Sequence, residues 1–374
     1  MILTKCAVCA TELGLSLGKK CGRCSTRYCG AECQKQHWES GGHDTLCKKI
    51  KKAGGAEQYN ANEKYTAAVA VAAEACAADT KGQTCYICTQ ALHWKTKEGL
   101  VRMCACRGTA GFAHLSCLAE QAKLLNDEGE ENNLSPEGRW RRWVTCSLCK
   151  QDYHGVVQCA LGWACWKTYV GRPKTCRPRV WAMTVLGNGL GEAEQDEDAL
   201  VVQEAELSTK RRVGESEYNI LVAQSNLAIT YENLERLDEA LRLKRDVYTG
   251  FLKLFGEEHE QTLRAVNNYA TSLVRLERFG EAKSLLRKTV HMVRRVLGES
   301  DETTLRFRSS YAAALCQDDC ATLGDLREAM TTLEDAGRIA RRVLGGAHPL
   351  TGAIERHLEW SRAALAARED TKIK

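Results

Sequence analysis

An array of cysteine and histidine pairs occupies residues 6–47: Cys6-x2-Cys9, Cys21-x2-Cys24, Cys29-x3-Cys33 and His43-x3-Cys47. A second array occupies residues 85–149: Cys85-x2-Cys88, Cys104-x-Cys106, His114-x2-Cys117 and Cys146-x2-Cys149. Four pairs provide eight ligands, which is enough for two tetrahedral zinc sites in each array. Because protein residues fill every position, such sites hold shape and do no chemistry. The sequence therefore predicts four structural Zn²⁺ ions per chain.

The cysteine count has a rival explanation, which is a framework of disulfide bonds. The chain has 374 residues, which suggests two or three domains, and it contains 20 cysteines. A secreted disulfide protein would begin with a signal peptide, yet Met1 to Thr4 run directly into the first ligand pair. The histidines of both arrays also sit at ligand spacing. We therefore expect zinc, and a reducing compartment that is cytoplasmic or nuclear.

The sequence does not predict a membrane or nucleic-acid partner. The most apolar segment, Tyr65 to Ala78, is short, rich in alanine and interrupted by Glu74. Residues 51–82 are better explained as an Ala-rich helical linker between zinc modules at residues 1–50 and 83–155. The net charge of +5 is modest. No basic stripe interleaved with aromatic residues indicates nucleic-acid binding in the first module.

The first array resembles a MYND-type zinc finger. Its residues include Tyr28-Cys29-x3-Cys33-Gln34, then His37-Trp38, then His43-x3-Cys47. The resemblance implies that the pairs interleave. One zinc ion would be held by Cys6, Cys9, Cys29 and Cys33, and the other by Cys21, Cys24, His43 and Cys47.

Two alternatives stay open for this module. Gly41-Gly42 lengthens the loop before His43, which makes His37 a second candidate ligand. His43 is preferred because a His-x3-Cys pair fits one helical turn. MYND fingers generally bind short proline-containing peptides, so the resemblance implies protein recognition. The alternative is a structural cap without a ligand.

The second array resembles a RING-CH (RINGv) domain. The motifs that carry the resemblance are Cys104-Ala105-Cys106-Arg107-Gly108-Thr109 and His114-x2-Cys117-Leu118. A PHD finger is the near relative, and the single residue between Cys104 and Cys106 favours RING-CH. The resemblance implies that Cys85, Cys88, His114 and Cys117 bind one zinc ion, and that Cys104, Cys106, Cys146 and Cys149 bind the other. The segment Asn126–Gly138, rich in Asp, Glu and Asn, is then expected to be a mobile acidic excursion.

RING-type domains recruit a ubiquitin-conjugating enzyme and promote transfer of ubiquitin from it without a nucleophile of their own. The resemblance implies that Ile87 docks that enzyme, together with Leu148 or Trp143 near the last ligand pair. Lys150, directly after the last ligand, would contact ubiquitin. Many RING-CH domains have tryptophan four residues after the sixth ligand, against the conjugating enzyme, and this chain departs from that pattern with Gln121.

The rest of the chain shows helical periodicity with a repeat. Asn226-Leu227-Ala228 recurs as Asn268-Tyr269-Ala270, 42 residues later, and Leu254-Phe255-Gly256 recurs as Val296-Leu297-Gly298 at the same interval. The third copy is five residues longer, between Leu315 and Ala329, and an earlier copy is expected from about residue 177. Two amphipathic helices per copy predict an all-α solenoid over residues 156–367, with 349–367 as the terminal cap helix.

The repeats resemble the tetratricopeptide repeats of kinesin light chains, through Tyr231-x2-Leu234-x2-Leu237-x-Glu239-Ala240 and Leu344-Gly345-x2-His348-Pro349. The resemblance implies that polar residues on the first helix of each copy hold a peptide in the concave groove. The matching residues are Asn226, Asn267, Asn268, Ser309 and Ser310. The alternative is that these side chains only join neighbouring helices.

The preferred function is therefore a RING-type ubiquitin ligase that selects protein or peptide substrates through its repeats and its MYND-like finger. A non-catalytic interaction scaffold with zinc-stabilised docking domains is the alternative. No nucleophile-base pair, phosphate-binding loop or open metal site is found in the sequence, so self-contained catalysis is not expected.

Overall fold

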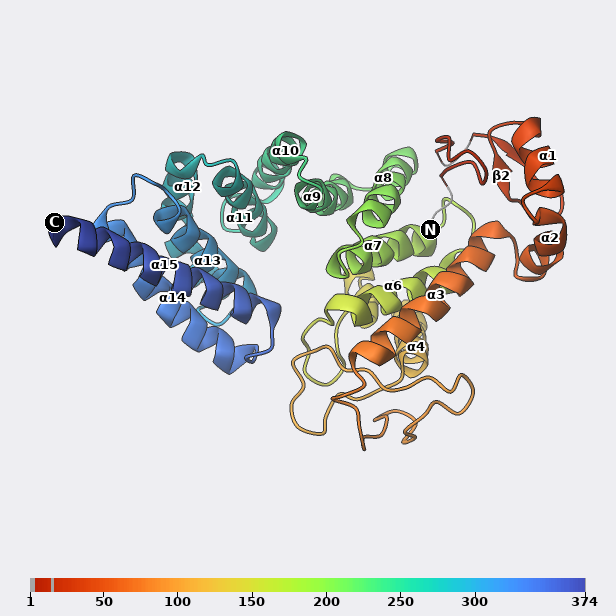
Figure 1. Cartoon of the computed structure of the whole chain (residues 1–374), viewed down its shortest axis with the longest axis horizontal. Helices are drawn as coiled ribbons and strands as arrows, with labels where there is room; N and C mark the ends of the chain where they lie inside the picture. The colour runs from red at the N-terminus through yellow and green to blue at the C-terminus, as the bar shows by residue number, and fades with distance from the viewer. Residues whose placement is uncertain (1–3, 15–16, 374) are drawn as a thin grey trace. The chain divides into compact units, whose positions relative to one another are not determined.

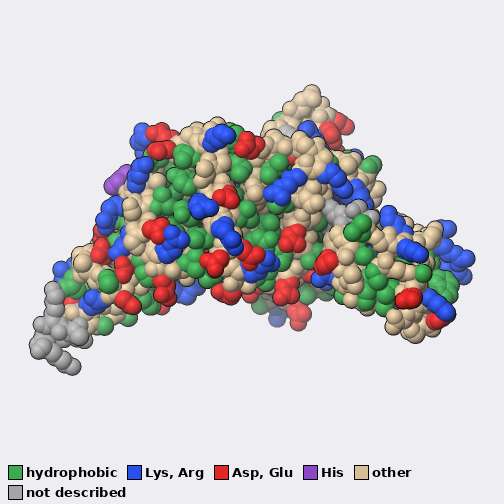
Figure 2. Space-filling model, turned by 90° about the horizontal axis from the view of Figure 1, so that it is seen from above, with side chains coloured by type: hydrophobic (Ala, Val, Ile, Leu, Met, Phe, Trp, Pro, Cys, Tyr) green, Lys and Arg blue, Asp and Glu red, His purple; other side chains and the backbone are tan. Residues whose placement is uncertain are grey.

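The computed structural model describes residues 4–14 and 17–373 and divides the chain into two compact units, Met1–Glu215 and Ser216–Lys374. The argument against a signal peptide concerned Met1 to Thr4, and of these residues Met1 to Leu3 lie outside the described residues. Helices make up most of each unit (Figure 1). Basic and acidic side chains are interspersed over the face in Figure 2. Among the described residues, no helix has the length and hydropathy required to cross a bilayer.

The first unit begins with a small module around two short strands. Strands β1 (Lys19–Lys20) and β2 (Arg27–Tyr28) pair antiparallel, and helices α1 (Ala31–Glu39) and α2 (His43–Lys52) follow. Gly42, directly before α2, has φ of 72°, a left-handed conformation that glycine adopts without the steric cost of a side chain. This turn places His43 at the start of α2. Tyr28 is fully buried at the centre of the module.

Helix α3 (Ala56–Ala75) occupies the segment expected to be a linker, and it packs against α6 (Gly155–Tyr169). The small side chains of Ala61 and Ala72 are fully buried and let the two helix backbones approach. Gln58 donates from Nε2 to the Lys167 carbonyl oxygen at 3.0 Å. Glu57 accepts a hydrogen bond of 2.7 Å from Arg179. Helix α3 is therefore part of the core of the first unit.

The second cysteine-rich module is built on helix α4 (Leu115–Glu131), followed by α5 (Pro136–Trp140) and the 3-10 helix η1 (Arg141–Trp143). The prediction of a mobile segment at Asn126–Gly138 is wrong, because α4 continues through its first half. Asn126 is only 3% exposed and donates to the Tyr169 hydroxyl at 3.1 Å. Burial against α6 orders a segment whose composition resembles that of a loop.

Helices α6, α7 (Arg177–Glu192) and α8 (Asp196–Arg212) complete the first unit. Trp163 and Trp166 of α6 are buried in a core shared with α3 and α7. Glu206 and Lys210 of α8 form a buried ion pair of 2.6 Å, and Thr184 of α7 donates to the same carboxylate. These three helices precede the unit boundary at Glu215, although they fall within the range predicted for the solenoid.

The second unit is a series of antiparallel helices, each of which contacts the next. Gly256 and Gly298 each follow the second helix of a copy with positive φ, 82° and 86°. This repetition reflects the 42-residue period, since only glycine adopts that conformation easily. The helices are α9 (Glu217–Asn233), α10 (Leu237–Phe255), α11 (Glu260–Arg275), α12 (Phe279–Leu297), α13 (Glu302–Cys316), α14 (Leu323–Val343) and α15 (Pro349–Ile373).

The turn between α13 and α14, residues 317–322, has six residues, against three in each of the turns after α9 and α11, so it accommodates three of the five additional residues of the third copy. Asp318 in this turn accepts a hydrogen bond of 2.6 Å from Lys283 of α12. Thr322 and Asp325 form a capping box at the start of α14, which satisfies backbone donors that a helix N-terminus leaves unpaired. The insertion is therefore ordered by contacts with the preceding copy.

Candidate functional site

Four groups of metal-binding side chains are assembled within the described residues, and in each group the ligand atoms lie within 4.8 Å of one another. The groups are Cys6, Cys9, Cys29 and Cys33; Cys21, Cys24, His43 and Cys47; Cys85, Cys88, His114 and Cys117; and Cys104, Cys106, Cys146 and Cys149. The 20 cysteines are all free. All 16 predicted ligands are thus brought together in the interleaved pairing that the resemblances implied.

The distances between ligand atoms fit zinc. Four thiolates at about 2.3 Å from one zinc ion lie about 3.8 Å from each other. The Sγ atoms of Cys9 and Cys33 are 3.7 Å apart, those of Cys21 and Cys47 are 3.9 Å apart, and those of Cys106 and Cys146 are 3.8 Å apart. The four groups therefore have the donor chemistry and the size of closed tetrahedral sites.

The two histidines present different nitrogen atoms to their groups. His43 places Nε2 at 3.4 Å from Cys24 Sγ. His114 places Nδ1 at 3.3 Å from Cys88 Sγ, while its Nε2 lies 3.4 Å from the Ala91 carbonyl oxygen. That carbonyl can fix the tautomer with the proton on Nε2, which leaves Nδ1 as the ligand. Burial lowers the pKa of His114, so the neutral, metal-binding form is favoured.

His37, the alternative ligand, is engaged elsewhere. Its Nδ1 lies 3.0 Å from the Tyr28 hydroxyl, and its ring packs against His43 with centroids 4.9 Å apart. His37 therefore buttresses the ligand and lies outside the metal group.

Hydrogen bonds change the pKa of several ligand thiols, and metal binding requires thiolates. A hydrogen bond from the Thr11 hydroxyl lowers the pKa of Cys9 to about 6. The hydrogen bond between Cys104 and Cys146 lowers the pKa of Cys146 and raises the pKa of Cys104, so one proton is shared between these two ligands.

Residues 85–149 match the RING-variant domain. Residues 6–47 match the MYND finger, and residues 219–295 match the tetratricopeptide repeat. The predicted identities of the three parts are confirmed, and so is the predicted fold class, zinc modules followed by an all-α solenoid. The chain is thus a zinc-finger protein with domains used for protein interaction.

Solved structures with similar folds include BtubC (BKLC) from P. vanneervenii, with 14% identity over 69% of this chain and 91% of that chain and a TM-score of 0.39. A putative kinesin light chain of Podosopora anserina with nearly identical TPR-like repeats has 20% identity over 61% and 97%, also with a TM-score of 0.39. A Rap protein complexed with competence and sporulation factor has 13% identity over 68% and 72%, with a TM-score of 0.38. The search of curated proteins gave no match.

The four docking candidates of the RING-variant domain differ in accessibility. Ile87 is 36% exposed and Leu148 is 48% exposed, each within the two-residue loop of a ligand pair. Lys150 is exposed, and its Nζ donates to the Ser147 carbonyl oxygen at 2.6 Å. Trp143 is fully buried beside Tyr169, with ring centroids 6.0 Å apart. The expectation that Trp143 could present a docking surface is therefore not supported, because it belongs to the core around α6.

Two residues of α4 were not among the predicted docking residues. Gln121 accepts hydrogen bonds from Tyr86 and Ser147, which adjoin Ile87 and Leu148. Leu124, one turn further along α4, is 51% exposed. The sequence contains a signal for both, since they lie four and seven residues after the ligand Cys117 and share a helix face with it.

The five groove candidates of the repeats also divide into two classes. Asn226, Asn268 and Ser310 are half-buried on α9, α11 and α13, the first helices of successive copies. Ser309 is 5% exposed, and its Oγ lies 2.9 Å from His357 Nδ1 on α15. Asn267 is 7% exposed, and its Oδ1 is buried without a hydrogen-bond partner. Ser309 therefore joins two helices, as the structural alternative predicted, and Ser310 Oγ also lies 3.4 Å from Thr271 Oγ1 on α11. Asn226 and Asn268 are half-buried.

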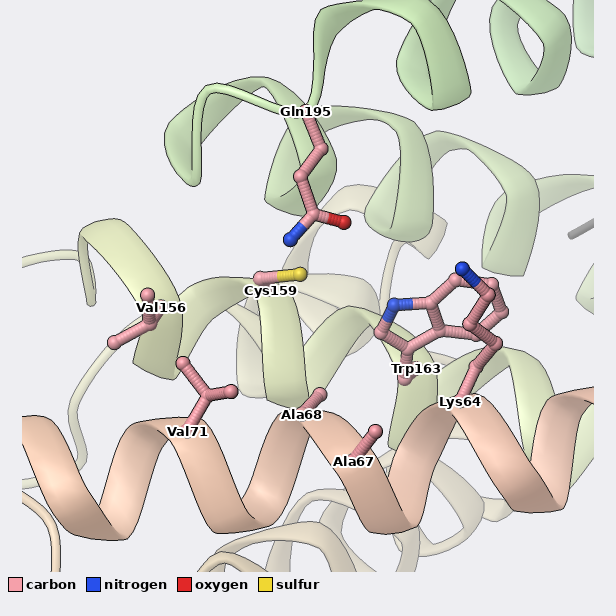
Figure 3. Close-up of a pocket in the computed structure, with 8 residues that line it drawn as sticks. All are labelled: Lys64, Ala67, Ala68, Val71, Val156, Cys159, Trp163 and Gln195. Carbon is pink, nitrogen blue, oxygen red and sulfur yellow. The ribbon is translucent and has the colours of Figure 1, made fainter.

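A cavity of about 150 Å³ lies between α3 and α6, and Gln195 reaches into it from the turn between α7 and α8 (Figure 3). Ala67, Ala68 and Val71 of α3 form one wall, and Cys159 lies opposite. Burial raises the pKa of Cys159 to about 11, so the thiol is neutral and a poor nucleophile near pH 7. The cavity therefore offers no catalytic thiol.

Proposed function

We propose that the chain binds four zinc ions, one in each ligand group, and that all four are structural. Each group already has four protein ligands, so no coordination position is left for substrate or water. The metal would supply a fixed tetrahedral geometry and no reactive group. The ligand residues of the chain would then hold two short loops, Cys85–Cys88 and Cys146–Cys149, in a defined arrangement.

We propose further that the RING-variant domain is a ubiquitin ligase that docks a ubiquitin-conjugating enzyme. The observation that supports this most is the exposure of Ile87 and Leu148 on the two metal-bound loops, since apolar side chains held rigidly at a surface favour binding to another protein. Transfer would then depend on orienting the conjugating enzyme and its ubiquitin, with no covalent step on this chain. Lys150 follows the last ligand, where its ammonium group can contact the ubiquitin.

The docking proposal predicts that Ile87→Ala and Leu148→Ala each reduce ubiquitin transfer by about 3- to 10-fold, since burying the exposed third to half of such a side chain contributes about 0.5–1.5 kcal/mol. The measurement is autoubiquitination with a panel of conjugating enzymes, together with the zinc content of each variant, which should not change. Leu134→Ala is the matched control, because Leu134 is 51% exposed beyond the far end of α4. If Leu134→Ala lost as much activity as Ile87→Ala, the assignment of Ile87 to a docking surface would be wrong.

The alternative function is a scaffold without ligase activity. The departure at Gln121 favours it, because many RING-CH domains have tryptophan at this position, against the conjugating enzyme. Wild-type protein that carries its full zinc content and still fails with every conjugating enzyme would favour the scaffold.

We propose that the repeats capture an extended peptide along Asn226, Asn268 and Ser310. An amide side chain can donate to and accept from a peptide backbone at the same time. The equivalent positions in successive helices also give a regular spacing along the solenoid, which suits a regular backbone.

This groove predicts that Asn226→Ala combined with Asn268→Ala weakens peptide binding by about 10- to 100-fold, at about 0.5–1.5 kcal/mol for each of two to three hydrogen bonds. The probe is a peptide selected from a displayed random library on the full-length protein, and its affinity is measured by calorimetry. Ser284→Ala on α12 is the control, since Ser284 is exposed on a second helix. A double variant that loses helicity would show that these amides join helices instead.

A further inference from the structure

The loop His93–Glu98 of the RING-variant domain has the backbone geometry of a metal-binding loop, although it lies outside the four metal groups. The His93 amide donates to the Glu98 carbonyl oxygen at 3.1 Å, the Lys97 amide donates to the His93 carbonyl oxygen at 2.9 Å, and Lys97 has φ of 59°. The ligand loop that begins at Cys85 has the two equivalent bonds, at 3.0 and 2.8 Å, and its fifth residue, Thr89, has φ of 62°. The chain therefore repeats the conformation of a ligand loop between its second and third ligands.

Hydrogen bonds close this loop in the way that a metal ion would close a ligand loop. His93 Nδ1 lies 2.8 Å from the Thr96 hydroxyl oxygen, and the Thr96 amide donates to the same nitrogen at 3.2 Å. The ring of His93 is 9% exposed and lies edge-on to the ligand His114, with centroids 5.4 Å apart. Glu98, at the other end, accepts a hydrogen bond of 2.6 Å from the Ser116 amide in the first turn of α4. The loop is thus fixed to the metal-binding module at both ends.

This fixed loop presents two apolar side chains to solvent. Trp94 is 68% exposed and Leu92 is 59% exposed, the two largest exposures of a large apolar side chain among the described residues of this domain. Within the described segment 89–97, only His93 is buried, so the residues on both sides of it form a projecting tip. Apolar groups held together at a surface mark a place where another surface binds.

Two lysines lie beside the apolar side chains. Lys95 and Lys97 are both exposed, and neither forms an ion pair in the part of the chain that the structure describes. Their ammonium groups are therefore available to an anionic partner. Apolar side chains next to basic ones are the combination with which proteins lie on the surface of a bilayer. The charge of the tip thus complements that of anionic lipid headgroups.

We propose that residues 92–97, the Trp94 loop, insert into the headgroup region of a bilayer that contains anionic phospholipids. Trp94 and Leu92 would enter the boundary between headgroups and acyl chains, where the indole ring can keep its N–H group hydrated. Lys95 and Lys97 would contact the lipid phosphates. A projecting tip favours lipid over a protein partner, because a protein must provide a pocket of matching shape whereas lipids adapt to the inserted groups.

This contact is at the membrane surface, and it goes beyond the ligase proposal without depending on it. No helix of the described residues has the length and hydropathy to cross a bilayer, so the Trp94 loop would provide reversible attachment. Because the loop is already fixed by His93 and Glu98, little conformational entropy is lost on insertion.

Flotation of the zinc-loaded, full-length protein with lipid vesicles tests the proposal. The vesicles contain phosphatidylcholine alone or phosphatidylcholine with about 30% phosphatidylserine. We expect wild type to bind the anionic vesicles, and Leu92→Ala with Trp94→Ala to lower the partition coefficient at least about tenfold, because two apolar side chains no longer leave water. Lys95→Ala with Lys97→Ala should lower it about 25-fold on anionic vesicles, about fivefold for each lysine, and much less on neutral vesicles.

Trp94→Phe identifies the inserted residue directly. It keeps an apolar ring and therefore most of the binding, but it should remove most of the quenching of tryptophan fluorescence by brominated phospholipids. Trp360→Ala is the matched control, since Trp360 is 46% exposed on α15, and it should bind and be quenched like wild type. Zinc content, measured for every variant, should not change.

Three results would overturn the proposal. In the first, Leu92→Ala with Trp94→Ala partitions like wild type, which would show that the tip does not enter the bilayer. In the second, Trp94→Phe is quenched as strongly as wild type, so another part of the chain is inserted. In the third, zinc-loaded wild type floats with neither kind of vesicle, which would exclude lipid and leave an acidic protein as the partner of the Trp94 loop.

Discussion

Chelation of the bound metal is expected to unfold residues 6–47 and the metal-binding loops at 85–114 and 144–149, while the second unit keeps its helices. Four of the eight buried apolar residues in the core of the MYND finger are cysteine ligands, so little apolar burial remains once the metal is gone. Structural zinc contributes about 10–16 kcal/mol per site in small fingers, which exceeds the stability of an ordinary domain. Elemental analysis before chelation should give four zinc ions per chain.

Hydrogen exchange measured by mass spectrometry provides the test. Amides of α1, α2 and the loops at Cys85–Cys88 and Cys146–Cys149 should lose protection as zinc is released. Amides of α11 to α13 are the internal control, since the core of these helices contains no metal ligand. Elemental analysis that finds two or fewer zinc ions in fully metallated protein would contradict the assignment of two sites to each module.

Glu232→Ala is expected to destabilise the second unit by about 3–5 kcal/mol, because it leaves a buried ammonium group without its partner. Lys244 and Glu232 are 3% and 8% exposed at their side chains and form an ion pair of 2.6 Å. Ser272 donates to the same carboxylate at 2.7 Å, and Arg275 donates to the Glu232 carbonyl oxygen at 3.0 Å. The network thus joins α9, α10 and α11, two successive copies of the repeat.

Urea unfolding of the full-length protein, followed by hydrogen exchange in α9 to α11, measures this effect. Glu235→Ala is the matched control. Glu235 also pairs with Arg275, at 2.8 Å, but its side chain is 73% exposed, and exposed pairs contribute about 0–1 kcal/mol. Replacing both Glu232 and Lys244 by apolar residues of similar volume should restore much of the lost stability. Equal effects of the two single variants would contradict the importance of burial.

Much of the architecture follows from spacing alone. Ligand pairs such as Cys85-x2-Cys88 specify metal loops because two donors must reach one ion across a tight turn. The 42-residue period specifies the solenoid because Gly256 and Gly298 end equivalent helices with equivalent backbone geometry. Both patterns are local in the sequence, and both can be recognised without knowledge of the tertiary contacts.

The tertiary environment of single side chains was harder to predict. Trp143 looked like a surface residue of the metal module, but α6 covers it. Asn126 lies in a segment with the composition of a loop, and the Tyr169 hydroxyl, 43 residues later in the chain, provides its hydrogen bond. In both cases the residue that contacts the side chain is distant in sequence, and neither composition nor periodicity predicts which residue that is.

The packing of α3 against α6 determines how this protein can be divided for laboratory work. A fragment truncated after residue 155, where the zinc-binding portion would seem to finish, lacks the helix that covers Ala61 and Trp143. Its newly uncovered apolar surface would favour aggregation during expression. A fragment extended to Glu215 retains α6, α7 and α8 and therefore keeps that surface covered. For expression and crystallisation, the better end point is Glu215, 66 residues beyond Cys149 of the last metal-binding pair, because helices rather than metal close the core of this unit.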